Sequence, residues 1–208
     1  IEVEGVKKLN PVTYEIMPDR IEAGTYLIAA AITRGMVRIT GIVPRHVEAL
    51  CRSLAEMGFA IESGDSWVSV APSKKLKGTI IKTSPYPGFP TDLQAPMMAL
   101  ATTVDGISVV IETIFENRFT HVPELRRMGA DITIEGNSAI IRGVKKLSAA
   151  PVMMSDLRAG AALVCAALAA KGETEIRRIY HADRGYEGMD RKLGGLGAGI
   201  KRIAGGKP

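Results

Sequence analysis

Three stretches of the chain repeat one pattern, and this repetition constrains the fold more than any other feature of the sequence. In each stretch an Asp precedes an almost uninterrupted apolar run, which ends at a Gly and leads into a strand-like segment. The stretches are residues 18–35, 91–106 and 155–172. A second similar segment follows each stretch, and these segments contain Gly58, Gly129 and Gly197. We therefore predict one small α/β unit that is used three times.

The middle unit shows the order of elements most clearly. β-Branched runs predict strands, Asp92 and Gly106 bracket a helical run, and the pair Gly136-Asn137 predicts a hairpin turn. The predicted elements are a strand at 79–83, a helix at 92–104, a strand at 107–112, a helix at 121–128, and hairpin strands at 130–135 and 138–142. The order of the unit is thus β-α-β-α-β-β.

The other two units follow the same order, with one gap at the end of the third. For the first we predict a strand at 13–17, helices at 19–34 and 44–57, a strand at 36–40 and a hairpin turning at Gly64 and Asp65. The third unit stops before a clear last strand, which is either missing or supplied by the chain start at residues 2–6. We predict one domain over residues 1–208, with units at about 12–72, 79–143 and 146–203, and with residues 1–11 completing the last sheet.

The two helices of a unit differ in kind. The segments 94–104 and 157–170 are apolar on nearly every side, whereas segments such as 45–57 carry charges along one side. A helix without a polar face is buried all round. We therefore predict an α/β fold in which three central helices, at about 19–34, 92–104 and 156–171, are buried and the sheets and outer helices surround them.

The composition is that of an ordinary soluble domain, and no apolar run is long enough to span a membrane. Two isolated cysteines and three scattered histidines argue against a metal site. The net charge of +5 suits an anionic ligand, but the aromatic content of 5% and the dispersed basic residues argue against nucleic-acid binding. We expect a cytoplasmic protein without a signal peptide, and the missing initiator Met indicates a processed product or, in preference, a domain cut from a longer protein.

The starts of the central helices are candidate ligand sites. If the three helices are parallel, their N-termini converge, and free N–H groups together with the helix dipole favour a phosphate or carboxylate there. Asp92 stands out because it follows a loop, residues 84–91, that contains three prolines. An Asp at a helix start is also the usual N-cap residue, so capping alone stays open as an explanation for each of these aspartates.

The same segments resemble the bacterial enolpyruvyl transferases over essentially the whole chain. The matching motifs are PDRIEAGTYLIAAAITRG, FPTDLQA, ETIFENRFTHVPELRRMGADI, SDLRAGAALVCAALAAKG and IYHADRGYEGMDRKLGGLGA. The resemblance implies an inside-out α/β barrel of three repeats, in an enzyme whose two such domains face each other across a cleft. Neither Cys51 nor Cys165 stands in a motif like the reactive-Cys loop of the family's other domain. The chain therefore resembles the C-terminal half alone, which should bind weakly and not turn over.

The resemblance also implies a reaction. The branch of the family with the FPTD and ENRF motifs transfers the enolpyruvyl group of phosphoenolpyruvate to the 3′-hydroxyl of UDP-N-acetylglucosamine, through a tetrahedral intermediate and with release of phosphate. This is the first committed step of peptidoglycan synthesis, and we expect no cofactor. The implied partners of the chain are these two substrates and the missing N-terminal domain, with no nucleic acid and no membrane.

Six residues match the family's site: Asp92, Ile114, Arg118, Asp156, Arg158 and Arg184. Asp92 is expected to contact the attacking hydroxyl, as general base or as the group that orients it. Ile114 is expected to offer a backbone contact to the nucleotide sugar. Arg118 is expected at the cleft, Asp156 and Arg158 near the phosphoenolpyruvate, and Arg184 is expected to reach the phosphate when the cleft closes.

Two other function classes remain open at this point. A non-catalytic nucleotide-sugar-binding or regulatory module of the same fold would need no turnover, but it would also not need all four motifs around the site residues. An RNA-end-processing or RNA-binding protein built of similar units is disfavoured by the few aromatic residues and the dispersed charge. A titration with the uridine diphosphate sugar and with RNA would separate these classes.

Overall fold

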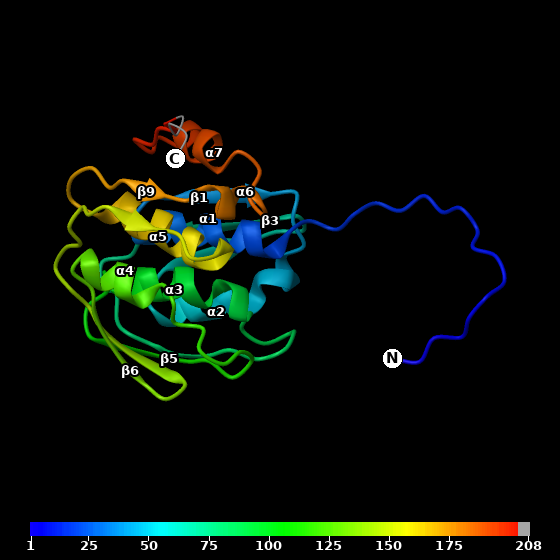
Figure 1. Ribbon diagram of the computed structural model, residues 1–208, viewed down its shortest axis with the longest axis horizontal. Coiled ribbons are helices and arrows are strands. Elements are labelled where there is room, and N and C mark those ends of the chain that lie inside the picture. The colour runs from blue at the N-terminus through cyan, green and yellow to red at the C-terminus, as the bar shows by residue number, and fades with distance from the viewer. Residues whose placement is uncertain (204–208) are drawn as a thin grey trace.

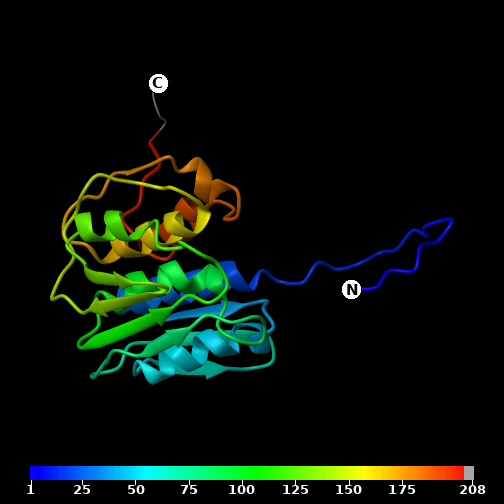
Figure 2. The ribbon, with the colours of Figure 1, turned by 60° about the horizontal axis from the view of Figure 1, so that its bottom comes forward.

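Three apolar helices form the centre of the molecule. The computed structural model describes residues 1–203. Helices α1 (Arg20–Ile32), α3 (Gln94–Ala101) and α5 (Leu157–Ala169) contact one another pairwise, and the sheets and remaining helices lie around them (Figures 1 and 2). All 8 residues of α3 are buried, as its sequence without a polar face predicts. The predicted burial of the three central helices is confirmed.

Local sequence explains how α1 starts and how closely it packs. Asp19 caps α1, because its Oδ1 accepts hydrogen bonds from the backbone N–H groups of Ile21 and Glu22 at 2.7 and 3.2 Å. A Cβ on Gly24 would lie 2.5 Å from Cδ1 of Leu93. The glycine therefore lets α1 approach the short 3-10 turn η2 (Thr91–Leu93), which leads into α3.

Each unit contributes one small sheet. The first sheet has the antiparallel order β1-β3-β2, with β1 at Val37–Thr40, β2 at Ala60–Ser63 and β3 at Trp67–Ala71. The second has the order β4-β5-β7-β6, with β4 at Ile80–Lys82, β5 at Ile107–Ile111, β6 at Asp131–Glu135 and β7 at Ser138–Arg142. In it β4 runs parallel to β5, and the other pairs are antiparallel. The third has only the parallel strands β8 (Val152–Met153) and β9 (Ile176–Arg177).

The outer helices are amphipathic, as predicted. In the first unit the 3-10 turn η1 (Pro44–Val47) leads into α2 (Glu48–Glu56), which buries Leu50 and Leu54 and leaves its charged side in solvent. The outer helices of the other units are α4 (Val122–Arg127), α6 (Tyr180–Asp183) and α7 (Met189–Gly195). One buried side and one charged side are typical of a helix that lies on the surface of a core.

Only the middle unit has the complete predicted order. It runs β4-α3-β5-α4-β6-β7, and Gly136, with φ of +58°, lies in the predicted hairpin turn. The first unit lacks its predicted strand before α1, so the predicted order is wrong there. In the third unit no hairpin follows α7 up to residue 203, and the sequence had already left the last strand of that unit open.

The N-terminal segment explains the missing first strand. Residues 1–19 form neither helix nor strand, are exposed, and extend away from the domain (Figures 1 and 2). The predicted strand at 13–17 is therefore absent, and residues 1–11 do not complete the third sheet. The alternation of Val12, Tyr14 and Ile16 gives strand propensity, but a strand also needs a neighbour to pair with, and this segment has none within the described residues.

Two further features bear on the expected class of protein. Across residues 1–203, every helix is too short or too polar to cross a membrane.

Cys165 is buried and Cys51 half-buried, both as free thiols, and burial raises the pKa of Cys165 to about 12 and that of Cys51 to about 11. Both thiols are therefore protonated at neutral pH and poor nucleophiles.

Candidate active site

The helices α3 and α5 begin at the same open depression in the surface. It has a volume of about 490 Å³. Its lining combines the first residues of these two helices with the loop between β5 and α4, namely Gln94, Ala95, Phe115, Glu116, Asn117, Arg118, Thr120, His121, Asp156, Leu157, Arg158, Ala159 and Arg184. The start of α1 is not part of this lining, and Asp19 caps its own helix. Two of the three predicted helix N-termini thus meet at the site.

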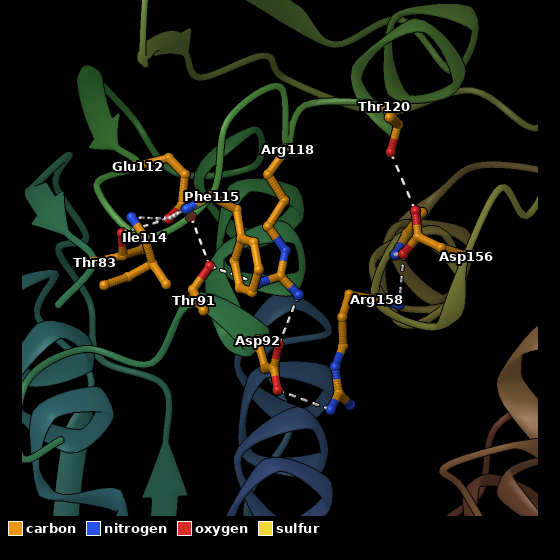
Figure 3. Close-up of polar contacts among 11 residues, drawn as sticks. Thr83, Thr91, Asp92, Glu112, Ile114, Phe115, Arg118, Thr120, Asp156 and Arg158 are labelled. Atoms are coloured by element: carbon orange, nitrogen blue, oxygen red, sulfur yellow. Dashed lines mark hydrogen bonds and ion pairs between the residues drawn. The ribbon is translucent and has the colours of Figure 1, made fainter. Parts of the chain in front are cut away.

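Asp92 is held between two arginines beside this depression. Arg118 Nη2 donates to Asp92 Oδ1 at 2.6 Å, and Arg158 Nη2 donates to Asp92 Oδ2 at 2.9 Å (Figure 3). Arg118 comes from the loop after β5, and Arg158 from the first turn of α5. The three side chains are partly shielded, between 21% and 34% exposed. The structure thus brings together three of the residues predicted from the sequence.

Asp92 is not a helix cap. It lies in η2, and neither η2 nor α3 has a side-chain capping hydrogen bond. Both carboxylate oxygens point to guanidinium groups instead. Capping, which the sequence left open as an explanation for this residue, therefore does not account for its presence.

Asp156, in contrast, does cap its helix. Its Oδ1 accepts from the backbone N–H groups of Arg158 and Ala159, both at 2.9 Å. Its Oδ2 accepts from Thr120 Oγ1 at 3.2 Å and from Ser155 Oγ at 3.0 Å. Asp156 therefore lies in the lining of the depression but is fully occupied in holding the start of α5 and the end of the loop after β5.

The carboxylates at the site are ionised at neutral pH. Burial raises the pKa of Asp92, but the hydrogen bond from Arg118 and the charges of Arg158 and Arg118 lower it by more, so that it lies below its usual value. The pKa of Asp156 is also lowered: burial raises it, and the hydrogen bonds from Ala159 N, Ser155, Arg158 N and Thr120 outweigh burial. Both groups therefore carry a negative charge that can stabilise a positive charge nearby.

Of the remaining predicted residues, Arg184 is part of the lining, whereas Ile114 is not and precedes the lining residue Phe115. Ile114 is 37% exposed, and its N–H donates to Glu112 Oε1 at 2.8 Å. Its carbonyl accepts no backbone hydrogen bond from residues 1–203. Arg184 is exposed at the end of α6 and has no ion pair with any described residue. Its neighbour Asp183 pairs with Arg202 instead. Arg184 is therefore free to turn toward an anion in the depression.

Sequence reasoning missed two buried groups at the site, Glu112 and His121. Every second residue along and just after β5 is buried: Ser108, Val110 and Glu112 are 1%, 0% and 2% exposed. The alternation of side chains along a strand would therefore have predicted that Glu112 is buried. His121 is 2% exposed at the start of α4. Burial lowers its pKa, Asp156 raises it and Arg118 lowers it, to about 4, so His121 is neutral at neutral pH. Nothing in its sequence context distinguishes it from a residue at a helix start.

The arrangement can bind an anion next to an ionised carboxylate. Three guanidinium groups, of Arg118, Arg158 and Arg184, face or border one depression, and a guanidinium is well matched to phosphate and carboxylate. Within residues 1–203 no three His, Cys, Asp or Glu side chains are grouped so that they could hold a metal ion. The chemistry that these residues offer is therefore proton acceptance and charge neutralisation.

Comparison with known proteins gives one family for most of the chain. A profile of the family described as EPSP synthase (3-phosphoshikimate 1-carboxyvinyltransferase) matches residues 1–193. The chain is 58% and 56% identical over 203 residues to proteins named UDP-N-acetylglucosamine 1-carboxyvinyltransferase from Geotalea daltonii and Geobacter metallireducens. Each match covers 98% of this chain and 49% of the relative. The chain thus spans about half the length of the curated relatives it matches.

Solved structures give the same fold. The enolpyruvyl transferase NikO from Streptomyces tendae superposes with a TM-score of 0.79 at 28% identity, over 89% of this chain and 44% of that one. EPSP synthase from Acinetobacter baumannii superposes with a TM-score of 0.59 at 20% identity, over 78% of this chain and 40% of that one. The chain therefore has the α/β fold of the enolpyruvyl transferases.

Proposed function

Because the chain belongs to the EPSP synthase family, we propose that it is half of a transferase that moves the enolpyruvyl group of phosphoenolpyruvate to the 3′-hydroxyl of UDP-N-acetylglucosamine. The names of the relatives at 58% and 56% identity support this choice of sugar nucleotide. In this function the protein acts in the first committed step of peptidoglycan synthesis. Its partner is the other half of the enzyme, since the relatives are about twice as long as this chain.

The observation that carries the proposal is the position of Asp92 between Arg118 and Arg158. An ionised carboxylate at the edge of an anion-binding depression can accept a hydrogen bond from the sugar 3′-hydroxyl and take its proton as the oxygen attacks C2 of phosphoenolpyruvate. The arginines act on the negative charge of the phosphate. They can neutralise the phosphate, first on the substrate and later as it leaves from the tetrahedral intermediate.

The remaining site residues fit supporting roles. The carbonyl of Ile114 is available to the nucleotide sugar, because it accepts no backbone hydrogen bond from a described residue. Arg184 is exposed and unpaired within the described chain, so it can swing onto phosphoenolpyruvate when the second half of the enzyme covers the depression. Asp156 keeps the start of α5, and with it Arg158, in place.

We also propose that the domain is an inside-out α/β barrel. The burial of α1, α3 and α5 and their pairwise contacts support this arrangement, because in it helices fill the interior and sheets lie outside. The two-stranded third sheet and the unpaired segment 1–19 then belong to parts of the barrel that the other half of the enzyme completes.

The proposal is tested with a hybrid enzyme, in which this chain is joined to the other half of the Geotalea daltonii relative. We expect the hybrid enzyme to release phosphate from phosphoenolpyruvate only when UDP-N-acetylglucosamine is present. A folded hybrid enzyme that binds UDP-N-acetylglucosamine without releasing phosphate would favour the non-catalytic binding module. RNA oligomers serve as the negative control in the binding titration.

A further inference from the structure

Glu112 is a fully buried carboxylate that the proposed chemistry does not use. It follows the last residue of β5, is 2% exposed, and accepts hydrogen bonds from Thr83, Thr91, Ile114 and Phe115 (Figure 3). A buried carboxylate is costly unless such donors satisfy it. Its two oxygens accept hydrogen bonds from different segments of the candidate site. Glu112 therefore does more than satisfy the N–H groups at the end of a strand.

The first oxygen holds the turn that carries Ile114. Glu112 Oε1 accepts from the N–H of Ile114 at 2.8 Å, from the N–H of Phe115 at 3.2 Å and from Thr83 Oγ1 at 2.9 Å. Thr83 in turn accepts from the N–H of Thr113 at 2.8 Å. The backbone at Ile114, which precedes the lining residue Phe115, is thereby tied to Thr83 directly after β4.

The second oxygen is connected to Asp92 through Thr91 and Arg118. Glu112 Oε2 lies 2.8 Å from Thr91 Oγ1, and Arg118 Nη1 donates to that same hydroxyl oxygen at 2.6 Å. A guanidinium has no acceptor, so the Thr91 oxygen must accept from Arg118 and give its own proton to Glu112. The other nitrogen of Arg118, Nη2, donates to Asp92. The hydrogen bonds therefore have one possible direction, from Arg118 through Thr91 to Glu112, which is the final acceptor.

We propose that Glu112 is a positioning residue: through Thr91 it holds Arg118 against Asp92, and through its other oxygen it fixes the Ile114 turn beside them. The kinetic part of this inference rests on the proposed function, whereas the structural part does not. The simpler alternative is that Glu112 only satisfies the N–H groups after β5 and has no influence on Asp92.

The variant Glu112→Gln separates these alternatives. Its amide oxygen can still accept from Ile114 N and Phe115 N, but its NH₂ group then faces Thr91 and cannot accept the hydroxyl proton. The link to Arg118 is weakened while the turn is kept. Thr91→Val removes the same link without changing any charge, and Thr91→Ser restores the hydroxyl. Glu56→Gln is the matched control, because Glu56 also accepts from a threonine, Thr79 Oγ1 at 3.2 Å, but lies outside the depression.

The first measurement is the pH titration of the Asp92 carboxyl carbon by NMR in the 208-residue chain. The charged groups that contact Asp92 are Arg118 and Arg158. We expect the pKa of Asp92 to rise in Glu112→Gln and Thr91→Val, because Arg118 moves away, and to stay at the wild-type value in Thr91→Ser and Glu56→Gln. Loss of the Glu112 charge alone would lower the pKa of Asp92, so the sign of the shift decides. An unchanged or lower pKa in Thr91→Val overturns the proposal, and this variant decides if Glu112→Gln does not fold.

The second measurement is kinetic and uses the hybrid enzyme. We expect Thr91→Val to lower kcat about 10-fold, the loss of one hydrogen bond to a charged group, with KM for UDP-N-acetylglucosamine within about 3-fold of wild type. Thr91→Ser should restore kcat, and the acid limb of the kcat profile should move to higher pH in Thr91→Val. A raised pKa of Asp92 without any change in kcat supports the positioning by Glu112 and contradicts the proposed role of Asp92. An unchanged pKa with full activity overturns the positioning and leaves the proposed function standing.

Discussion

Asp92 and Arg158 are 66 positions apart in the sequence, and their side chains meet at 2.9 Å. The contact joins the turn before α3 to the first turn of α5, so it links two of the three repeats at the candidate site. It can form only when the central helices pack against each other. The burial of those helices therefore determines where the charged groups of the site lie.

Replacing Asp92 by Asn in the hybrid enzyme should reduce kcat by about 10²–10⁴-fold, because the proton acceptor is lost while the shape of the side chain is kept. The helix is not affected, since Asp92 caps neither η2 nor α3. Phosphate release gives kcat and thermal melting reports on folding. Asp131→Asn, which removes an exposed ion pair with Arg142, is the control and should leave kcat unchanged. Near-normal kcat in Asp92→Asn would show that this carboxylate is not the acceptor.

Arg184→Ala should raise KM for phosphoenolpyruvate in the hybrid enzyme by about 10-fold or more, because one charge-assisted contact to the phosphate is lost. Thermal stability should not change, since Arg184 is exposed and has no ion pair within residues 1–203. Arg177→Ala removes another exposed arginine, which lies on β9 and pairs with Glu175, and it should leave KM unchanged. Equal KM values in the two variants would remove Arg184 from the site.

The chain should lose stability as the pH falls from about 6.5 toward 4, because of His121. Its pKa drops from 6.5 in the unfolded chain to about 4 in the folded protein, so the unfolded state binds the proton first. At pH 4 the loss amounts to about 3 kcal/mol. The pKa values of Asp92 and Asp156 are lowered in the folded protein, so the stability that these groups contribute is lost as the pH falls below the ordinary aspartate value of 3.8.

Urea unfolding of the wild-type chain and of His121→Asn, measured at several pH values, checks this prediction. The free energy of unfolding of the wild type should fall between pH 6.5 and pH 4, and that of the variant should fall less. Parallel curves over this range would mean that His121 is accessible to protons in the folded protein.

The cap at Asp156 should be visible in stability. Asp156→Ala removes the two backbone hydrogen bonds at the start of α5 and should cost about 1 kcal/mol or more, whereas Asp156→Asn keeps a capping side chain and should cost less. Urea unfolding at pH 7 measures both. Equal losses in the two variants would indicate that the charge of Asp156, and not its capping, stabilises the helix.

The sequence predicted those features that depend on local pattern. The apolar run at 157–170 predicted a buried helix, observed as α5, and the glycine at 136 predicted the turn between β6 and β7. What it could not predict depends on distant contacts. The partners of Asp92 lie 26 and 66 positions away, so the loop before Asp92 marks it as a candidate but does not show which side chains it contacts. The strand expected at 13–17 failed for the same reason, because its pairing partner is not set by its own residues.

The most direct test of the half-enzyme function is phosphate release from phosphoenolpyruvate and UDP-N-acetylglucosamine, measured for three samples at equal concentration. These are the 208-residue chain alone, the other half of the Geotalea daltonii relative alone, and the hybrid enzyme. We expect turnover only in the hybrid enzyme, because Asp92 and its arginines then face a second set of groups across the depression. Sustained phosphate release by the 208-residue chain alone, or none by a folded hybrid enzyme, would contradict it.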